Sequence, residues 1–452
     1  MSVASLVLLM VLGQSPTSSV EPSDLVARLG ASRYAERQAA TEALERLGRQ
    51  ALPALRSARG ERDPEVRSRV AALLTRIEGA LLTQPSTVQL EFNDAPLHEV
   101  LKSFSDQSGI KLMLQNENSE PLRTRRVTIH ESEPLPFWKA LDRLCDAARL
   151  QYNNIPNGVP GGREPTFLLF DGQNRPSAPT FDTGPFRVSV LGLHYQRDIS
   201  FQHRIVTRQR VPAGRGVAEP ASTPGGFTTQ TNEQCYAQLQ VVGEPRLTLA
   251  MSGALKITEA IDDKGQSLLP PDSNNRTVQR SAGYFGFANS FIQGQALLAR
   301  PIAPGSTIRV LRGVIPVSVS TRKPSPLSVP LRESKGKTLQ NDDASVVIHD
   351  VRQLPNTRQT SIDVTIRPLK DASPVPANEV MYNRPDTHQQ QVEVVDSQGR
   401  VVPWYPSMID GESGRMTITL TSPEQVATEL RYYSLARATT DVKFEFNDLP
   451  LP

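Results

Sequence analysis

The spacing of apolar residues changes twice along this chain, and this constrains the fold more than any other feature of the sequence. Between residues 23 and 79 apolar residues recur at helical spacing. Between residues 86 and 173 helical and alternating stretches follow one another, and beyond residue 180 apolar and polar residues mostly alternate. The sequence therefore predicts a multidomain α+β protein that begins with helices and continues into antiparallel sheets.

The composition excludes several classes of protein. Hydrophobic residues make up 38% and charged residues 21% of the 452 residues, which is too apolar for a disordered chain and too polar for a multi-span membrane protein. The 50 basic and 47 acidic side chains nearly balance, so no nucleic-acid partner is expected. The 37 prolines favour many short elements joined by turns over long helices.

An apolar run from Val3 to Leu12 predicts export. It is too short to span a membrane but has the length of the apolar core of a signal peptide. Small residues at Val11 and Gly13 permit cleavage after Gly13, and no cysteine follows the run to carry a lipid anchor. We expect a signal peptide within residues 1–20 and a periplasmic or secreted mature protein without a stable membrane span. The alternative is that the run forms a buried strand or the start of a helix.

Residues 23–82 are expected to form a small helical segment. Asp63-Pro64 is a helix start signal, and the residues of one apolar stripe follow it: Val66, Val70, Leu73 and Ile77. The run Tyr34 to Gly48, then Leu52-Pro53-Ala54-Leu55, then Asp63 to Arg67 resembles a HEAT-like repeat pair. It amounts to about one and a half repeats, and a free-standing solenoid usually needs about three or more. We therefore expect a helical cap or docking module whose alternating arginines and glutamates form a solvated face.

Residues 86–173 are expected to form a second domain of β-α-β-β-α-β order. Val88 to Phe92 alternates like a strand, Asp94 is expected to cap the following helix, and Gly109 ends that helix. The stretch from Val88 to Leu97, the Gly109-Ile110 turn, and Val127-Thr128-Ile129 leading to Ala140-Leu141 resemble the short N-terminal domain of secretins and TonB-dependent receptors. The resemblance implies a non-catalytic docking unit in the periplasm. No secretin pore domain or receptor barrel follows, so it does not imply a channel or transporter.

Two tandem antiparallel β-sandwiches are expected in residues 180–322 and 327–452. Several stretches of the first have counterparts in the second, most clearly Glu259 to Gly265 and Glu393 to Gly399. The Asp-x-x-Gly in each is hairpin chemistry, because glycine adopts positive φ without strain. The two hairpins should therefore occupy equivalent places in the two sandwiches.

The last strand repeats an earlier segment of the chain. Glu445 to Leu451 copies Glu91 to Leu97 at all but one position. We expect Asp441–Pro452 to form a final strand that completes the second sandwich, with Phe444 and Phe446 on its buried face. The alternative is a free peptide that pairs with a secretin-like module in another molecule.

The sequence contains none of the common catalytic or phosphate-binding motifs. Asp262-Asp263 and Asp342-Asp343 are expected to form turns rather than calcium sites. Two distant cysteines, Cys145 and Cys235, are expected to be small buried side chains. The six histidines are scattered singly and lack metal-ligand spacing: His98, His130, His194, His203, His349 and His388. No enzyme activity, cofactor or metal is expected, and the sequence names no partner-binding residue.

Three functional hypotheses remain. The leading one is an exported, non-enzymatic bacterial envelope protein that acts as a protein-binding scaffold or docking component, in which the secretin-like domain binds an envelope protein. The second is a carbohydrate-binding protein that uses aromatic residues of the sandwiches, and the third is a hydrolase with a nonstandard site. The aromatic residues in question are Tyr284, Phe285, Phe287, Phe291, Trp404 and Tyr405, for which filling the sandwich cores is the simpler interpretation.

Overall fold

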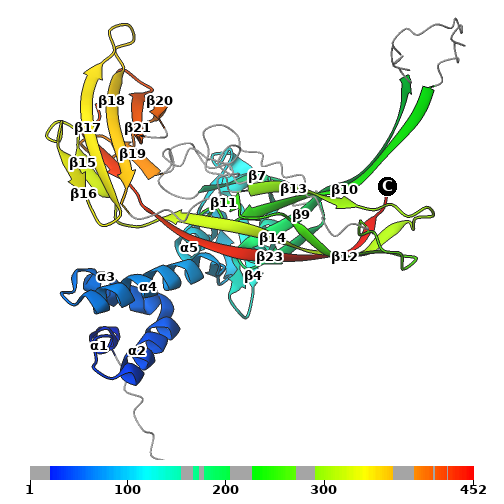
Figure 1. Cartoon of the computed structure of the whole chain (residues 1–452), viewed down its shortest axis with the longest axis horizontal. Helices are drawn as coiled ribbons and strands as arrows, with labels where there is room; N and C mark the ends of the chain where they lie inside the picture. Colours follow the sequence, from blue (N-terminus) through cyan, green and yellow to red (C-terminus); the bar gives the residue numbers. More distant parts are fainter. Residues whose placement is uncertain are drawn as a thin grey trace, which may run out of the picture. The chain divides into compact units, whose positions relative to one another are not determined.

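The computed structural model describes most of the chain beyond the predicted signal peptide, which lies outside the described residues. The described residues are 21–153, 166–172, 178–203, 227–270, 291–369, 391–410, 413–424 and 426–452. The chain divides into two compact units, residues 1–81 and 82–452. A few helices precede a large number of strands in several sheets, so the predicted multidomain α+β class is confirmed (Figure 1).

The first unit is helical, as predicted. Its helices are α1 (Pro22–Arg28), α2 (Tyr34–Leu47), α3 (Leu52–Ser57) and α4 (Pro64–Leu82), with short 3-10 turns at Gly48–Ala51 and Ala58–Gly60. The Asp63 side chain accepts a hydrogen bond from the Glu65 amide at 2.8 Å, which caps α4 as the sequence predicts. The predicted stripe of α4 is buried, with exposures of 0–7% from Val66 to Ile77. It packs against buried residues of α1, α2 and α3 in one apolar core.

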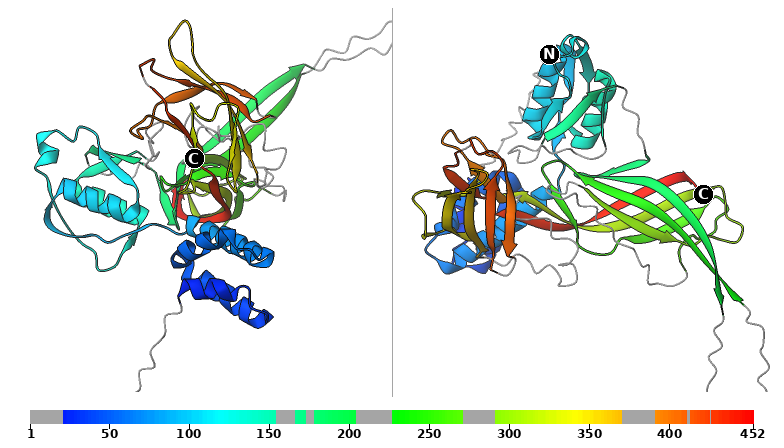
Figure 2. Two further views of the ribbon diagram at one scale, coloured as in Figure 1. Left: turned by 90° about the vertical axis from the view of Figure 1, so that its left-hand side faces the viewer. Right: turned by 90° about the horizontal axis from the view of Figure 1, so that it is seen from above.

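The second unit begins with an α/β module, here residues 86–172, in which two amphipathic helices pack against short strands (Figure 2). Its elements are β1 (Thr87–Val88), β2 (Glu91–Pro96), α5 (Leu97–Ser108), β3 (Lys111–Leu114), α6 (Glu120–Arg123), β4 (Arg126–His130), β5 (Leu135–Pro136), α7 (Phe137–Ala148), β6 (Leu150–Tyr152) and β7 (Thr166–Asp171). The longer elements follow the predicted order. The strands form a β2-β4 pair, a β1-β5 pair and a sheet of order β3-β7-β6, in which β3 runs parallel to β7.

The helix cap predicted at Asp94 is wrong. Pro96 is the residue before α5, and no side chain caps the N-terminus of α5. Asp94 instead lies in a bulge of β2 with a φ of 47° and contacts Arg126 at 2.8 Å. A strand that ends in Asn-Asp-Ala-Pro resembles a cap in sequence, but here the acidic residue tolerates the left-handed conformation that the bulge requires.

Two sheets that share one core follow the module and form the first sandwich, here residues 178–322 and 435–450. One sheet has the order β13-β10-β9-β8, and the other contains β11, β14 and β12, with β23 pairing β14. The strands are β8 (Thr180–Thr183), β9 (Phe186–His203), β10 (Phe227–Gly243), β11 (Thr248–Met251), β12 (Lys256–Asp262), β13 (Phe291–Leu298), β14 (Thr307–Arg322) and β23 (Leu435–Pro450).

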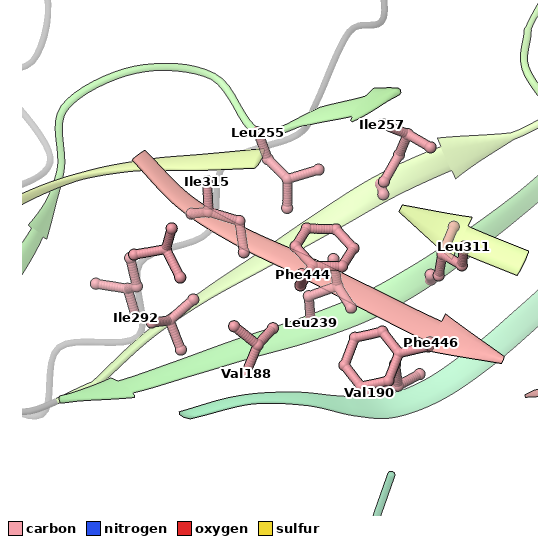
Figure 3. Packing of buried hydrophobic residues seen from close by; sticks show 14 of the residues in the cluster. Val188, Val190, Leu239, Leu255, Ile257, Ile292, Leu311, Ile315, Phe444 and Phe446 are labelled. Atoms are coloured by element: carbon pink, nitrogen blue, oxygen red, sulfur yellow. The ribbon is translucent and has the colours of Figure 1, made fainter. Parts of the chain in front are cut away.

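The prediction that the final strand completes the second sandwich is wrong. β23 pairs antiparallel with β14 from Arg322↔Leu435 to Thr307↔Pro450, and the two long strands lie side by side in Figure 1. Its side chains Phe444 and Phe446 lie among residues of the first sandwich such as Val190 (Figure 3). The alternation predicts which side chains are buried, but it does not specify which sheet the strand joins.

The second sandwich, here residues 327–432, is thus inserted between β14 and β23. Its sheets have the orders β16-β17-β18-β21-β20 and β15-β22-β19 and enclose a separate core. The strands are β15 (Leu327–Pro330), β16 (Thr338–Gln340), β17 (Ala344–Gln353), β18 (Thr360–Pro368), β19 (Val392–Val395), β20 (Trp404–Asp410), β21 (Arg415–Leu420) and β22 (Glu429–Tyr432).

The two sandwiches share strand order, a bulge and a turn. The order β8-β9-β10-β13 matches β16-β17-β18-β21, and the pairing skips one residue at corresponding places, Leu191 and His349. The predicted hairpins follow β12 and β19, which pair with the corresponding strands β14 and β22. In each turn the glycine has positive φ, 80° at Gly265 and 73° at Gly399. The expected equivalence of the two hairpins is confirmed, while β20 has no counterpart in the first sandwich.

Candidate docking groove

A groove of about 950 Å³ lies on the α/β module between α5, β3 and α6. The α5 side is a single helix face, because its residues follow the spacing i, i+3, i+4, i+7 and i+8. The residues that line the groove are His98, Leu101, Lys102, Ser105, Asp106, Gly109, Lys111, Leu112, Leu114, Glu117, Asn118, Leu122 and Arg123. A 12-residue helix is about 18 Å long, so the groove follows a wall of that length.

The free edge of β3 forms part of the opposite wall. Among the described residues, β3 pairs only with β7. The Gln115 amide donates to the Leu169 carbonyl on β7. Because the backbone groups of successive residues in a strand point to opposite sides, those of Leu112 and Leu114 point away from β7. Ser105 on α5 accepts a hydrogen bond from the Leu112 amide at 3.0 Å. No described group pairs with the Leu112 carbonyl or with the amide of Leu114, and both face the groove.

The turn from α5 into β3 explains why the strand edge meets the helix. Gly109 follows α5 in the left-handed conformation with a φ of 69°, as the sequence predicts. The Ser108 hydroxyl donates to the Phe104 carbonyl at 2.8 Å and accepts from the Ile110 amide at 3.2 Å, which fixes the reversal. Ile110 is fully buried and anchors the start of the strand. The helix face and the strand edge are thereby placed side by side.

The groove combines an apolar floor with a charged rim. Leu101, Leu112 and Leu122 are buried with exposures of 3–8% and belong to the core of the module. On the rim, Lys102 forms an ion pair with Asp106 at 2.5 Å. Arg123 is exposed and has no carboxylate partner among the described residues. Such a surface suits a ligand with apolar side chains and at least one negative charge.

A buried arginine fixes the module to the first sandwich within the second unit. Arg187 of β9 has a side chain only 5% exposed and contacts Asp142 of α7 at 2.7 Å and Asp182 of β8 at 2.6 Å. It also donates to the hydroxyl of Tyr152, and its guanidinium lies 5.0 Å from the Trp138 ring centre. Burial raises the pKa of the Tyr152 hydroxyl, so this group stays protonated and bonds to Asp142.

A second buried charge holds the segment that leads into the module. Glu244 is fully buried, and its carboxylate accepts hydrogen bonds from the amide and the hydroxyl of Ser86, both at 2.8 Å. Arg246 neutralises it at 2.7 Å. The Trp138 indole also donates to the Pro185 carbonyl at 3.1 Å. The segment around Ser86, which leads into the module, is therefore bonded to the first sandwich.

The predicted turn residues and cysteines have the expected structural roles. The Asp262 carboxylate accepts from the Lys264 and Gln266 amides at 3.1 and 2.7 Å, which is turn chemistry. Asp342-Asp343 also lies in a turn, where Asn341 accepts from the amides of Asp343 and Ala344. Cys145 and Cys235 are free and buried, as predicted.

The described histidines are not gathered into one site. His98 lines the groove, His194 stacks on Tyr236 at 4.9 Å between ring centres, and His349 contacts Thr365 at 2.8 Å. His130 is an exposed residue at the end of β4. The side chain of His203 and the whole of His388 lie outside what the structure describes.

Two of the three described aromatic residues that were considered for sugar binding pack against cores. Trp404 packs against the core of the second sandwich, and Phe291 packs partly buried against the core of the α/β module. Tyr405 is 43% exposed on the edge strand β20. The segment with Tyr284, Phe285 and Phe287 lies outside the described residues. The described part of the chain therefore presents no row of exposed aromatic rings like that of a sugar-binding sheet.

Known proteins give no guide to the function of this chain. No protein-family model and no curated protein matches this chain. Within the described ranges, no three His, Cys, Asp or Glu side chains are grouped as metal ligands. None of the described helices has both the length and the apolar character of a membrane span. The residue pattern predicts the module but not its groove, because the groove depends on which strand forms the edge of the sheet.

Proposed function

We propose that this protein is an exported, non-enzymatic docking component of the bacterial cell envelope, and that the groove of its α/β module binds another envelope protein. The observation that supports this proposal is the free edge of β3, whose backbone groups face an open groove with an apolar floor. Exposed strand edges bind other polypeptides readily, because unpaired amides and carbonyls gain hydrogen bonds there.

The fixed attachment of the module supports the same proposal. Arg187 and Glu244 connect the module to the first sandwich through buried, charge-assisted hydrogen bonds. A scaffold gains from such attachment because a preorganised site loses less conformational freedom on binding. The second sandwich would then extend the platform, and the helical segment of residues 21–81 would supply a further docking surface.

Site-specific photo-crosslinking of the full chain in envelope fractions tests this function. A photoreactive amino acid replaces Asn118, an exposed residue of the groove, or Lys139, an exposed residue of α7 outside it. We expect a discrete crosslinked protein from position 118 and none from position 139. The same products from both positions, or none from position 118, would contradict docking in the groove. Point replacement is preferable to deleting the module, because deletion would uncover Arg187 and the buried Val242.

A further inference from the structure

The groove has dimensions and unpaired groups that specify how a polypeptide would bind in it. Its α5 wall is about 18 Å long, and an extended strand advances about 3.3 Å per residue, so about five residues of a strand fit along it. From this geometry we infer that the partner contributes one extended segment of about five residues, which adds to β3 in the parallel direction and bears a carboxylate for Arg123. This inference rests on the proposed function.

The direction follows from the bond between Ser105 and Leu112. Because the Leu112 amide already donates to Ser105, three backbone groups remain on this edge: the Leu112 carbonyl and the amide and carbonyl of Leu114. In parallel pairing, one residue of the added strand donates its amide to the Leu112 carbonyl and accepts from the Leu114 amide with its own carbonyl. The residue two positions later donates its amide to the Leu114 carbonyl. All three groups are then used.

Antiparallel pairing fits these groups less well. A residue of an antiparallel strand opposite Leu112 would exchange two hydrogen bonds with it, and one of these needs the Leu112 amide. An antiparallel strand would also reach all three free groups, but the residue whose amide bonds the Leu112 carbonyl would retain an unpaired carbonyl beside the apolar floor, since Ser105 occupies the Leu112 amide. In parallel pairing the carbonyl that would face the Leu112 amide belongs to a residue two positions before the first bonded one, so the segment can leave the groove before that point. An unpaired buried carbonyl lowers the affinity by about 5- to 150-fold. The cap on Leu112 thus selects the parallel direction.

The chemistry of the segment follows from the floor and the rim. Side chains of a strand alternate in direction, so every second residue of the segment faces the floor made by Leu101, Leu112 and Leu122. On the rim, Arg123 has no carboxylate partner within the described ranges, whereas Asp106 already neutralises Lys102. An alternating apolar–polar segment with a glutamate or aspartate is the complementary ligand.

Peptide binding to the full chain tests the inference. The probe is a fluorescein-labelled seven-residue peptide of alternating valine and threonine with a glutamate at each end. We expect Leu114→Pro to weaken binding at least tenfold, because proline removes the free amide, and Arg123→Glu to weaken it about threefold or more. The matched charge reversal Lys139→Glu on α7 should leave the affinity within twofold. Equal affinity for the wild-type chain and for Arg123→Glu would overturn the charge assignment.

Two controls keep the test independent of misfolding. A peptide of the same sequence with methylated backbone nitrogens retains its side chains but loses its amide donors, so we expect it not to bind the unmodified protein. Binding of that peptide with unchanged affinity would overturn strand addition. Nitroxide labels on either end of the peptide give the direction: an N-terminal label should broaden the amide signal of Lys111, and a C-terminal label that of Glu117. The reverse assignment would overturn the parallel direction.

The peptide-binding experiment and the crosslinking experiment can fail independently. A partner crosslinked at Asn118 without any binding of the peptide would overturn the strand-addition mode and leave the docking function intact. Failure of both experiments would overturn the proposed function as well.

Discussion

Deleting Asp441–Pro452 should unfold the first sandwich and leave the second sandwich folded. The deleted segment supplies four buried side chains to the first core: Val442, Phe444, Phe446 and Leu449, with exposures of 1–4%. Figure 3 shows the two phenylalanine rings among side chains of β9, β10 and β14. The core of the second sandwich contains no residue from the described part of this segment.

The magnitude follows from the buried apolar groups. Full burial of a large apolar side chain contributes about 1.5–3 kcal/mol, so the four together contribute about 6–12 kcal/mol. This is comparable to the ~5–15 kcal/mol that stabilises a whole domain. Loss of pairing along β14 adds to the effect, because the part of β14 from Thr307 to Pro316 would become a sheet edge with unpaired backbone groups. The first sandwich should therefore not remain folded at room temperature.

Hydrogen exchange resolved by segment is the suitable assay, because a multidomain chain does not have a single unfolding transition. In the truncated protein, amides of β9 and β10 should lose protection while those of β17 and β18 keep it. Phe444→Ala alone should cost about 3–5 kcal/mol in the first sandwich, whereas Asp441→Ala, at an exposed position of the same strand, should change little. Unchanged protection in β9 and β10 after truncation would refute the reasoning.

Three further predictions concern single side chains. Arg187→Ala should destabilise the chain by about 2–4 kcal/mol in denaturant unfolding, because two carboxylates that contact the guanidinium lose their cation; an unchanged midpoint would exclude this role. Although burial opposes it, hydrogen bonds from backbone amides hold the pKa of Asp262 below its ordinary value of 3.8. The stabilisation that the ionised Asp262 gives the folded state is therefore complete well above pH 3.8 and is lost as the pH falls through the lowered pKa. The melting temperature of the wild-type protein should thus exceed that of Asp262→Asn at pH 6, and the difference should shrink below about pH 4. Burial raises the pKa of the thiols of Cys145 and Cys235, so both should react with a thiol reagent only after unfolding, and fast reaction of the native protein would contradict their burial.

Local elements could be predicted from the sequence because their signals are local. The stripe of α4 and its start at Asp63-Pro64 depend on residues within a few turns of the helix. The two Asp-x-x-Gly turns depend on one glycine and one carboxylate, and both adopt the same hydrogen-bond pattern. The repeated segment shows the same behaviour, because its aspartate has positive φ in both copies, 47° at Asp94 and 55° at Asp448.

Features set by distant parts of the chain could not be predicted in the same way. The destination of β23 depends on β14, which lies more than a hundred positions earlier in the sequence. The candidate groove depends on β3 being the edge of its sheet, and no property of Lys111–Leu114 specifies that position. Ser105 is unremarkable in sequence, and only the backbone group opposite its hydroxyl gives it a role.

The insertion of the second sandwich between β14 and β23 imposes an order on the biogenesis of the chain. The first sandwich needs β23, yet β14 ends at Arg322 and β23 begins at Leu435. At synthesis rates of ~5–20 residues per second, the ribosome needs roughly 6–20 seconds to produce the intervening residues. During that time β14 lacks β23, and all strands of the second sandwich have been made before β23 is synthesised. Of the two sandwiches, the one whose strands begin earlier in the chain is therefore completed last.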